Sequence, residues 1–203
     1  MSTLSQVLSP LTIKSMELAN RVVMPPMGTN LGNADGTVSP ENIAYMKRRA
    51  KGKPGLIITE ITGVHPEGVV SPNQLAAYDD RFIPGLKKLV SAAHDAGTKI
   101  AVQIHHAGRE SLYLLDEGKA MAPSAIRSIV FRKTPREMTT EDIEEVIAAF
   151  GAAADRGREA GFDAVEIHCA HGYLLTQFLS ASWQEPGVRP RNGQLRIWYP
   201  YPV

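Results

Sequence analysis

Two histidines and a tyrosine stand close together near residue 170. His168 follows the apolar stretch 164–167, His171 comes three residues later, and Tyr173 follows after one glycine. Imidazole and phenol groups can donate hydrogen bonds to one oxygen atom and can exchange protons with a bound molecule. In α/β proteins, such residues at the carboxyl end of a buried strand commonly form the active site. We therefore expect the chemistry of this chain to lie here.

Other roles for these side chains stay open. The two histidines could be ordinary polar residues at a strand end, and Tyr173 could be a packing residue. Together with His105 and His106, which follow another predicted strand, the histidines could also bind zinc. A closed zinc site needs three or four well-placed ligands, and no carboxylate stands at a ligand spacing here, so we expect no metal. The one cysteine, Cys169, is expected to be a small buried apolar residue.

Composition limits the classes of function. The chain has 203 residues, of which 43% are hydrophobic and 21% are charged, and its formal net charge is +1. So small a net charge gives no reason to expect a nucleic-acid or membrane partner. No apolar stretch reaches the ~20 residues of a membrane span, and the N-terminus has no signal-peptide pattern. A single cysteine excludes an intrachain disulfide, so we expect a cytoplasmic protein.

Predicted strands and helices alternate along the chain after a short hairpin over 8–18. Buried strands are predicted at about 21–25, 55–59, 99–104 and 164–167, and amphipathic helices at about 40–51, 81–96 and 140–160. The third helix has the clearest ends, because Thr139 and Asp142 suit a capping box and Gly161 suits a helix stop. This βαβ order predicts a parallel sheet, and the long loops after the strands favour a (β/α)₈ barrel.

The length allows only part of such a barrel. Four βα units occupy about 180 residues, whereas eight need ~250 or more. The stretch 183–203 has no apolar period and ends in prolines and aromatic residues. We therefore predict the first four βα units of a truncated TIM barrel over 1–182, with an N-terminal β-hairpin. The tail over 183–203 is interpreted as aberrant, from a frameshift or a truncation of the gene.

Six motifs in a fixed order resemble those of a known family. They lie at 20–27, 55–60, 78–80, 103–109, 122–124 and 166–175. Together they resemble the old yellow enzyme family of FMN-dependent NADH:flavin oxidoreductases and NADH oxidases over about 5–182. The likeness is closer to the bacterial ene-reductase and 2,4-dienoyl-CoA reductase-like members than to the yeast type. It implies a (β/α)₈ barrel that binds FMN and takes electrons from NAD(P)H.

The resemblance implies flavin contacts at particular residues. Pro26, Met27 and Gly28 resemble the loop after the first strand that packs against the flavin ring, although Gly28 lacks the side chain of some relatives. Ile61 resembles a residue beside the ring that is usually a smaller alanine. Gln103 resembles the glutamine that binds the pyrimidine edge, where an amide can donate and accept hydrogen bonds.

The resemblance also implies the catalytic roles. His168 and His171 resemble paired donors that hold the carbonyl oxygen of the substrate, with His168 beside the flavin, and Tyr173 resembles the phenol that delivers a proton. The implied reaction is reduction of the activated C=C bond of an α,β-unsaturated carbonyl compound by hydride transfer from reduced FMN. The implied partners are a small enone or enoyl substrate and, in an oligomer, further copies of the chain.

The sequence also departs from the family. After residue 180 it lacks the family's next motif and strands 5 to 8, which carry a basic residue at the flavin and the phosphate-binding loops. One cysteine cannot hold an iron–sulfur cluster, so none is expected. Two alternative functions stay open: an inactive fragment without flavin, and a metal-dependent barrel hydrolase that uses the histidines.

Three further charged residues are not assigned to the catalytic chemistry. Arg109 is interpreted as a solvated charge in the long loop after the third predicted strand, and contact with the substrate or with the phosphate of NADPH is the alternative. Glu60 and Glu166 lie within predicted apolar strands, where a carboxylate needs hydrogen-bond donors. We expect both to be hydrogen-bonding groups of the barrel interior.

Overall fold

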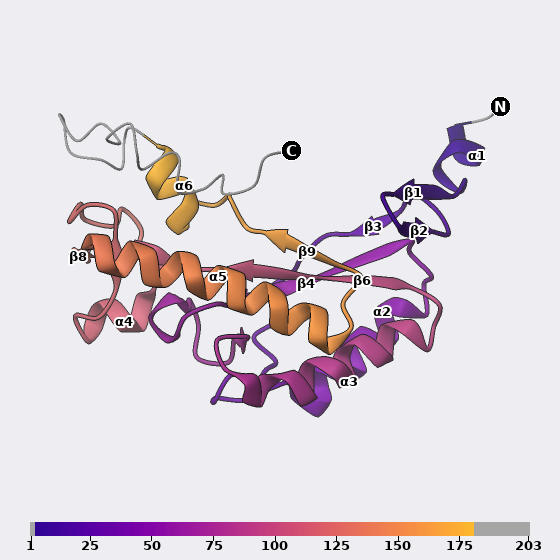
Figure 1. Ribbon diagram of the computed structural model, residues 1–203, viewed down its shortest axis with the longest axis horizontal. Helices are drawn as coiled ribbons and strands as arrows, with labels where there is room; N and C mark the ends of the chain where they lie inside the picture. The colour runs from indigo at the N-terminus through magenta and orange to yellow at the C-terminus, as the bar shows by residue number, and fades with distance from the viewer. Residues whose placement is uncertain (1–2, 181–203) are drawn as a thin grey trace.

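A parallel β-sheet with helices on one side forms the centre of the molecule (Figure 1). The computed structural model describes residues 3–180, so the tail predicted over 183–203 lies outside the described residues. The main strands follow the spatial order β3-β4-β6-β9, and each neighbouring pair is parallel. They are β3 (Val23–Met24), β4 (Leu56–Gly63), β6 (Lys99–His105) and β9 (Ala164–Ile167).

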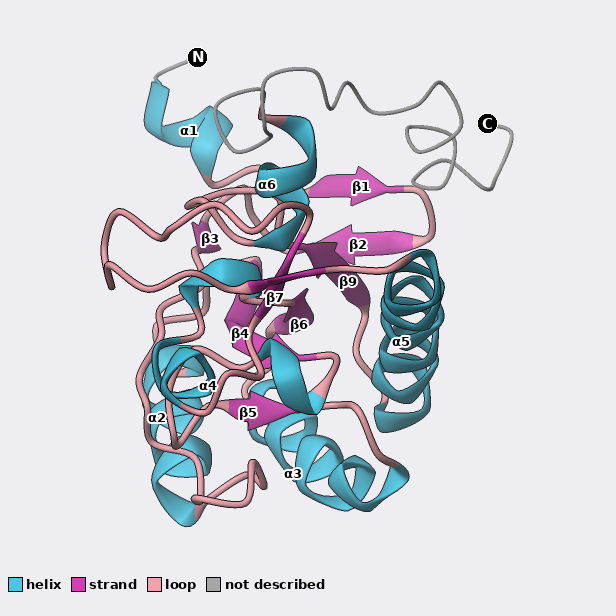
Figure 2. Ribbon diagram, turned by 90° about the vertical axis from the view of Figure 1, so that its left-hand side faces the viewer, coloured by secondary structure: helices cyan, strands magenta, loops and turns pink. Residues whose placement is uncertain are grey.

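Three long helices cover one face of this sheet (Figure 2). They are α2 (Pro40–Ala50), α3 (Ile83–His94) and α5 (Thr140–Ala160), and α3 lies between the other two. Apolar side chains of all three helices pack with the outward side chains of the strands, and Leu86, Ile100 and Val146 are almost completely buried there. Burial of this apolar surface is the main term that stabilises the layer of helices on the sheet.

The N-terminal hairpin covers the lower part of the opposite face of the sheet. Strands β1 (Leu11–Ile13) and β2 (Met16–Leu18) pair antiparallel, which confirms the predicted hairpin. Leu18 packs in a small apolar cluster with Leu56 of β4 and Ala101 of β6, and both of these residues lie near the amino-terminal ends of their strands. The hairpin therefore covers the amino-terminal part of this face and does not cover the carboxyl-terminal ends of the strands.

Several predicted boundaries are confirmed because they depend on local chemistry. The side chain of Thr139 accepts from Asp142 N and the side chain of Asp142 accepts from Thr139 N, which is the expected capping box of α5. Gly161 ends α5 with a φ of 93°, a conformation that suits glycine. Ser39 and Asn42 form a second capping box at the start of α2.

Other boundaries differ from the predictions. The first strand, β3, has only two residues, because Pro25 and Pro26 cannot donate to a sheet ladder. Asp79 caps a short 3₁₀ turn, η2 (Asp80–Phe82), so α3 begins at Ile83 and not directly after Asp80. Strand β4 runs to Gly63, beyond the predicted end at residue 59, with a shift of register between Ile58 and Ile61.

The long loop after β6 contains short elements of its own. They are η3 (Gly108–Glu110), α4 (Leu112–Asp116), β7 (Met121–Ala122) and β8 (Arg136–Glu137). The remaining short elements are α1 (Thr3–Val7), η1 (Pro66–Gly68), β5 (Leu75–Ala76) and α6 (Leu174–Leu179). The parallel pair of β7 and β8 joins the middle of this loop to the segment just before α5, and the loop lies at the carboxyl-terminal end of the sheet (Figure 1).

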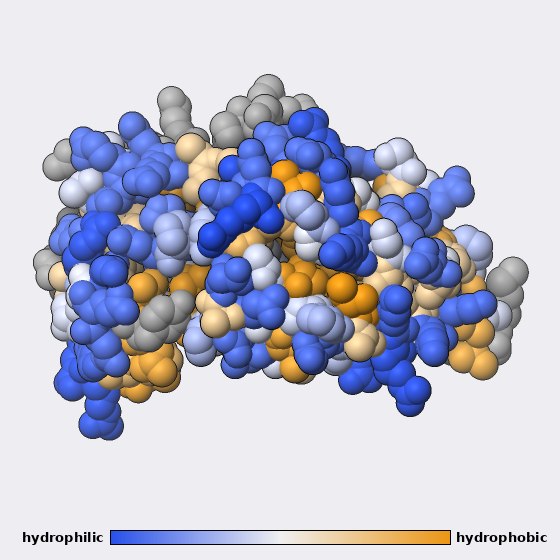
Figure 3. All heavy atoms as spheres, turned by 90° about the horizontal axis from the view of Figure 1, so that it is seen from below, coloured by the Kyte–Doolittle hydropathy of each residue, from blue (hydrophilic) through white to orange (hydrophobic). Residues whose placement is uncertain are grey.

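The outer surface and the edges of the sheet differ in polarity. Seen from below the helices, the surface is mainly hydrophilic with separate apolar patches (Figure 3). Strand β9 forms one edge of the described sheet, and β3 and the short β5 pair with β4 at the other; Val23, Val165 and Ile167 are exposed. No helix in the part of the chain that the structure describes is long and apolar enough to cross a membrane.

Candidate active site

Polar side chains gather on the uncovered face of the sheet, towards the carboxyl ends of the strands. Val102 of β6 points to the helix layer, where it lies against Gly157 of α5. Successive strand residues alternate between the two faces, so Gln103 points to the uncovered face. In the parallel register, Gln103 stands between Ile61 of β4 and Glu166 of β9. These three positions form one row across the sheet.

A cluster of aromatic rings lies beyond this row. The ring centre of Tyr173 is 4.8 Å from that of His105 and 5.1 Å from that of His168. The ring centres of His168 and His171 are 5.0 Å apart, and Nδ1 of His171 lies 3.1 Å from Nε2 of His168. The structure therefore brings together the three predicted catalytic side chains and adds His105 behind them.

The turn that carries these residues has an unusual backbone. His171 has a φ of 57° and Gly172 a φ of 73°, so two successive residues are left-handed. Histidine tolerates this region better than most residues, but it remains uncommon for a side chain with a Cβ. Left-handed residues outside glycine concentrate at functional sites, where the surrounding structure holds them.

Gln177 holds this turn against the loop after β6, and sequence reasoning missed it. Its Nε2 donates to Gly172 O (2.6 Å) and to Ala107 O (3.2 Å), while its Oε1 accepts from Arg109 N (3.2 Å). The side chain is completely buried. The position of this glutamine on the buried side of the short helix α6 could have indicated its role, because a buried amide needs hydrogen-bond partners for its polar atoms.

Burial sets the protonation of the cluster. It lowers the pKa of His105 to about 3, with a further contribution from His168. Burial and the neighbouring His171 also lower the pKa of His168. Burial and the charge of Glu110 raise the pKa of the Tyr173 phenol. At neutral pH the cluster therefore holds neutral imidazoles at His105 and His168 and a protonated phenol.

The predicted flavin contacts fall into two groups in the structure. Gln103 is buried and donates from Nε2 to Glu166 Oε1 (2.5 Å), in the same row as the partly buried Ile61. Glu166 is thus a hydrogen-bonding group, as expected. Pro26, Met27 and Gly28 lie in the loop after β3, where Met27 is exposed and a Cβ added at Gly28 would meet no atom within 4 Å. This loop therefore presents an open surface.

Two expectations about this region are wrong. Arg109 is not a solvated charge: its side chain is fully buried and NH1 donates to Ile126 O (2.8 Å), because the loop folds back over η3. Cys169 is not buried but exposed, because it follows the edge strand β9. Among residues 3–180 the structure groups no three His, Cys, Asp or Glu side chains in a way that could hold a metal ion.

Comparison with known proteins assigns the chain to a family. The model of the NADH:flavin oxidoreductase / NADH oxidase family matches residues 6–185. The chain belongs to this family. The match covers both the aromatic cluster and the loop after β3, and it confirms the resemblance to the old yellow enzymes that the motifs carry.

Curated relatives and solved structures agree with this assignment. The chain is 44% identical over 169 residues to an NADPH dehydrogenase of Clostridium acetobutylicum, covering 83% of the chain and 49% of that protein. It is 45% identical over 170 residues to an NADH oxidase of Thermoanaerobacter brockii, covering 83% of the chain and 26% of that protein. The chain thus spans about half or less of the length of these relatives.

The fold matches part of larger solved enzymes. Old Yellow Enzyme from Pichia sp. AKU4542 superposes with a TM-score of 0.87 at 30% identity, covering 95% of this chain and 54% of the other. Morphinone reductase in complex with tetrahydroNAD gives a TM-score of 0.85 at 29% identity, covering 94% and 57%. The described α/β fold therefore corresponds to about half of an old yellow enzyme chain.

Proposed function

We propose that this chain supplies the N-terminal half of an FMN-dependent NAD(P)H oxidoreductase that reduces the activated C=C bond of α,β-unsaturated carbonyl compounds. The observation that carries the proposal is the cluster of His168, His171 and Tyr173 at the carboxyl end of the parallel sheet. Family membership supports it, as do relatives named NADPH dehydrogenase and NADH oxidase. We also propose a cytoplasmic location and a small enone or enoyl substrate.

The proposal includes an architecture. Strands β3, β4, β6 and β9, with the helices after the first three, are taken as the first four βα units of an eight-stranded barrel over 1–182. The two open edges of the described sheet support this, since a closed barrel has no edge strands. The chain aligns with 54% of the Pichia enzyme, which is the share expected for about half of a barrel. The other half, or a second copy of this chain, would complete the sheet.

The residues present suit FMN by their chemistry. Gln103 offers a buried amide that can both donate and accept, as the edge of an uncharged heterocycle requires. The open space around Gly28 leaves room for a flat ring to approach the backbone. When bound, FMN supplies the hydride transfer, while the protein binds, orients and polarises the substrate.

The histidines of the cluster are suited to hold a carbonyl oxygen. His168 is neutral because burial and His171 lower its pKa, so it can offer one N–H without carrying a charge. Negative charge that develops on the oxygen during reduction is stabilised by such donors, each worth about 3 kcal/mol. A bound oxygen has to replace the present bond between His168 Nε2 and His171 Nδ1.

Tyr173 is suited to deliver the proton. Its phenol stays protonated at neutral pH because burial and Glu110 raise its pKa. The centre of its ring lies 5.1 Å from that of His168, so the phenol and the imidazole are direct neighbours. A positioned general acid of this kind typically contributes about 10²–10⁴-fold to the rate.

A flavin titration tests the proposal directly. FMN is added to the purified chain, and its absorbance and fluorescence are followed, with binding expected as a shift of the visible bands. NADPH or NADH is then added without oxygen, followed by 2-cyclohexen-1-one as a simple enone. Bleaching by the nucleotide and recovery with the enone are the expected results.

Other outcomes select the alternative functions. Folded protein that takes up no FMN would support the inactive fragment and overturn the proposal for this chain on its own. Stoichiometric zinc in the purified protein, measured by elemental analysis, would support a metal-dependent hydrolase. Circular dichroism of each sample shows whether the chain is folded, so that lack of binding is not confused with lack of structure.

A further inference from the structure

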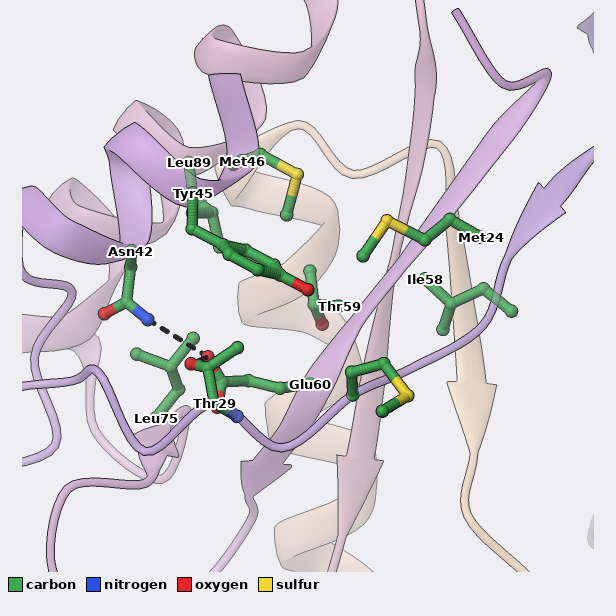
Figure 4. A pocket seen from close by; sticks show the side chains of 11 residues that line it. Met24, Thr29, Asn42, Tyr45, Met46, Ile58, Thr59, Glu60, Leu75 and Leu89 are labelled. Atoms are coloured by element: carbon green, nitrogen blue, oxygen red, sulfur yellow. Dashed lines mark hydrogen bonds between the residues drawn. The ribbon is translucent and has the colours of Figure 1, made fainter. Parts of the chain in front are cut away.

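The carboxylate of Glu60 receives hydrogen bonds from two separate segments of the chain. Thr29 donates to it twice, from N to Oε2 (2.8 Å) and from Oγ1 to Oε1 (2.6 Å), and Asn30 N donates to Oε2 (3.3 Å). Asn42 of α2 donates from Nδ2 to Oε1 (3.0 Å). Figure 4 shows the side chains of Thr29 and Asn42 directed towards Glu60. Glu60 itself is 8% exposed.

Asn42 cannot rearrange freely. Its Oδ1 accepts from Ser39 N (3.1 Å) in the capping box of α2, so its Nδ2 must face Glu60. Ser39 Oγ in turn donates to Leu31 O (2.6 Å). The start of α2, the segment 29–31 and the irregular part of β4 are thereby joined in one hydrogen-bonded network.

The loop just before this network has few bonds of its own. Between Met24 of β3 and Thr29, residues 25–28 make no hydrogen bond to any other residue within 3–180. Two prolines restrict its backbone, and Met27 is exposed. The loop is therefore held at one end by the β3–β4 ladder and at the other by Glu60.

We propose that Glu60 is a positioning residue that fixes the loop 25–30 in the conformation that receives the flavin ring. The role in flavin binding rests on the proposed function, whereas the role in fixing the loop does not. An ionised carboxylate accepts only, which suits a site where every neighbouring polar group is a donor. Bonds from backbone N–H groups to a carboxylate are also stronger than bonds between neutral groups.

The substitution Glu60→Gln tests this arrangement with little change of shape. One acceptor oxygen becomes an NH₂ group, which then faces either the N–H groups of Thr29 and Asn30 or the Nδ2 of Asn42. The first orientation is unfavourable because backbone N–H groups can only donate, and the second because the capping box keeps Asn42 Nδ2 directed towards residue 60. We expect hydrogen exchange at the Thr29 and Asn30 amides of the flavin-free protein to become at least about tenfold faster, and the Kd for FMN to rise by about tenfold.

Two control variants separate positioning from general effects. Glu41→Gln removes an exposed carboxylate one residue before Asn42 and should change neither measurement. Thr139→Ala removes the distant cap of α5, which lowers stability without touching the loop, and it too should leave exchange at 29–30 and the Kd unchanged. If Glu60→Gln does not fold, Thr29→Val removes one donor and should show the same changes at smaller size.

The two measurements have distinct consequences. Unchanged exchange at Thr29 and Asn30 in folded Glu60→Gln overturns the positioning role. Faster exchange with an unchanged Kd for FMN overturns the link to the flavin and leaves only the structural one. If the unmodified chain binds no FMN, the proposed function fails for this chain, and the exchange result alone supports or overturns the fixing of the loop.

Discussion

The imidazoles of His168 and His171 hydrogen-bond to each other, with 3.1 Å between His168 Nε2 and His171 Nδ1. His168 is buried, whereas His171 is exposed and has a left-handed backbone. A neutral imidazole has one N–H, so this bond uses the donor of one ring and the lone pair of the other. A carbonyl oxygen that binds here takes over the donor that the bond now occupies.

Replacing His171 by alanine removes one of the two imidazoles proposed to hold the carbonyl oxygen of the substrate. We expect the rate of enone reduction to fall by about 10²–10³-fold, the usual effect of losing one donor to a developing oxyanion. Reduction of the bound flavin by NAD(P)H should change much less, because no negative charge develops on a carbonyl oxygen when the nicotinamide loses its hydride. Stopped-flow absorbance measures the two half-reactions separately.

His94→Ala is the matched control for this variant. His94 also bonds through its ring, to Asp163 Oδ2 (2.8 Å), but it lies at the end of α3. It should leave both half-reactions unchanged. Equal enone reduction by His171→Ala and the unmodified chain would contradict the proposed role.

Tyr173→Phe keeps the ring and removes the acidic proton. We expect reoxidation of the reduced flavin by an enone to slow by about 10²-fold, and flavin reduction by NAD(P)H to be unaffected. Tyr78→Phe is the control, because Tyr78 packs edge-on against Phe82, away from the cluster. A similar loss of rate in both variants would mean that the hydroxyl of Tyr173 has no specific role.

The buried histidines make stability depend on pH. The pKa of His105 is about 3 in the folded chain, compared with 6.5 when it is free in water, and the pKa of His106 is also lowered well below that value by burial. Below about pH 6.5 the unfolded chain therefore binds more protons at these histidines than the folded chain does. Each histidine then costs up to about 1.4 kcal/mol of unfolding free energy per pH unit.

Urea unfolding at about pH 7, 6 and 5 measures this loss of stability. The stability that these histidines contribute is present above pH 6.5 and decreases towards their folded pKa values. In His105→Asn the decrease should be smaller, because one of the histidines with a lowered pKa is absent. An unchanged slope in this variant would show that His105 takes up no proton on unfolding.

Gln177→Met should destabilise the chain while keeping the size of the side chain. It removes the bonds of Gln177 to Gly172 O, Ala107 O and Arg109 N, of which Ala107 O keeps a second bond from Glu110 N. Each unsatisfied buried group costs about 1–3 kcal/mol, so we expect a loss of about 3 kcal/mol in the free energy of unfolding. Equilibrium urea unfolding at neutral pH gives this value.

Thr176→Val is the control on the same helix. The buried Oγ1 of Thr176 has no hydrogen-bond partner among the described residues, so its removal should be close to neutral. If both variants lose the same stability, the loss arises from packing of α6 and not from the bonds of Gln177.

Local chemistry was sufficient to predict many elements. Thr139, Asp142 and Gly161 determine the ends of α5 through groups that lie within a few residues of one another. The apolar stretch of β9 and the hairpin over 8–18 were likewise predicted from patterns contained in short segments. The order of the motifs was enough to recognise the family, because each motif lies within a few consecutive residues.

The environment of single side chains was not predictable in the same way. The burial of Arg109 depends on Ile126, in a part of the loop that folds back over it, and the exposure of Cys169 depends on β9 being an edge strand. Glu60 was expected only to form hydrogen bonds, and its partners come from segments 18 and about 30 residues away.

The sequence by itself therefore predicted the hairpin, the four main strands, the three long helices, the family and the three residues proposed as the catalytic cluster. Only the tertiary structure decided which buried polar groups satisfy one another, as Gln177 satisfies Gly172 and Ala107. The physical reason is range. Caps, turns and apolar periods act between neighbours in the chain, whereas burial and long-range hydrogen bonds depend on segments that meet only after folding.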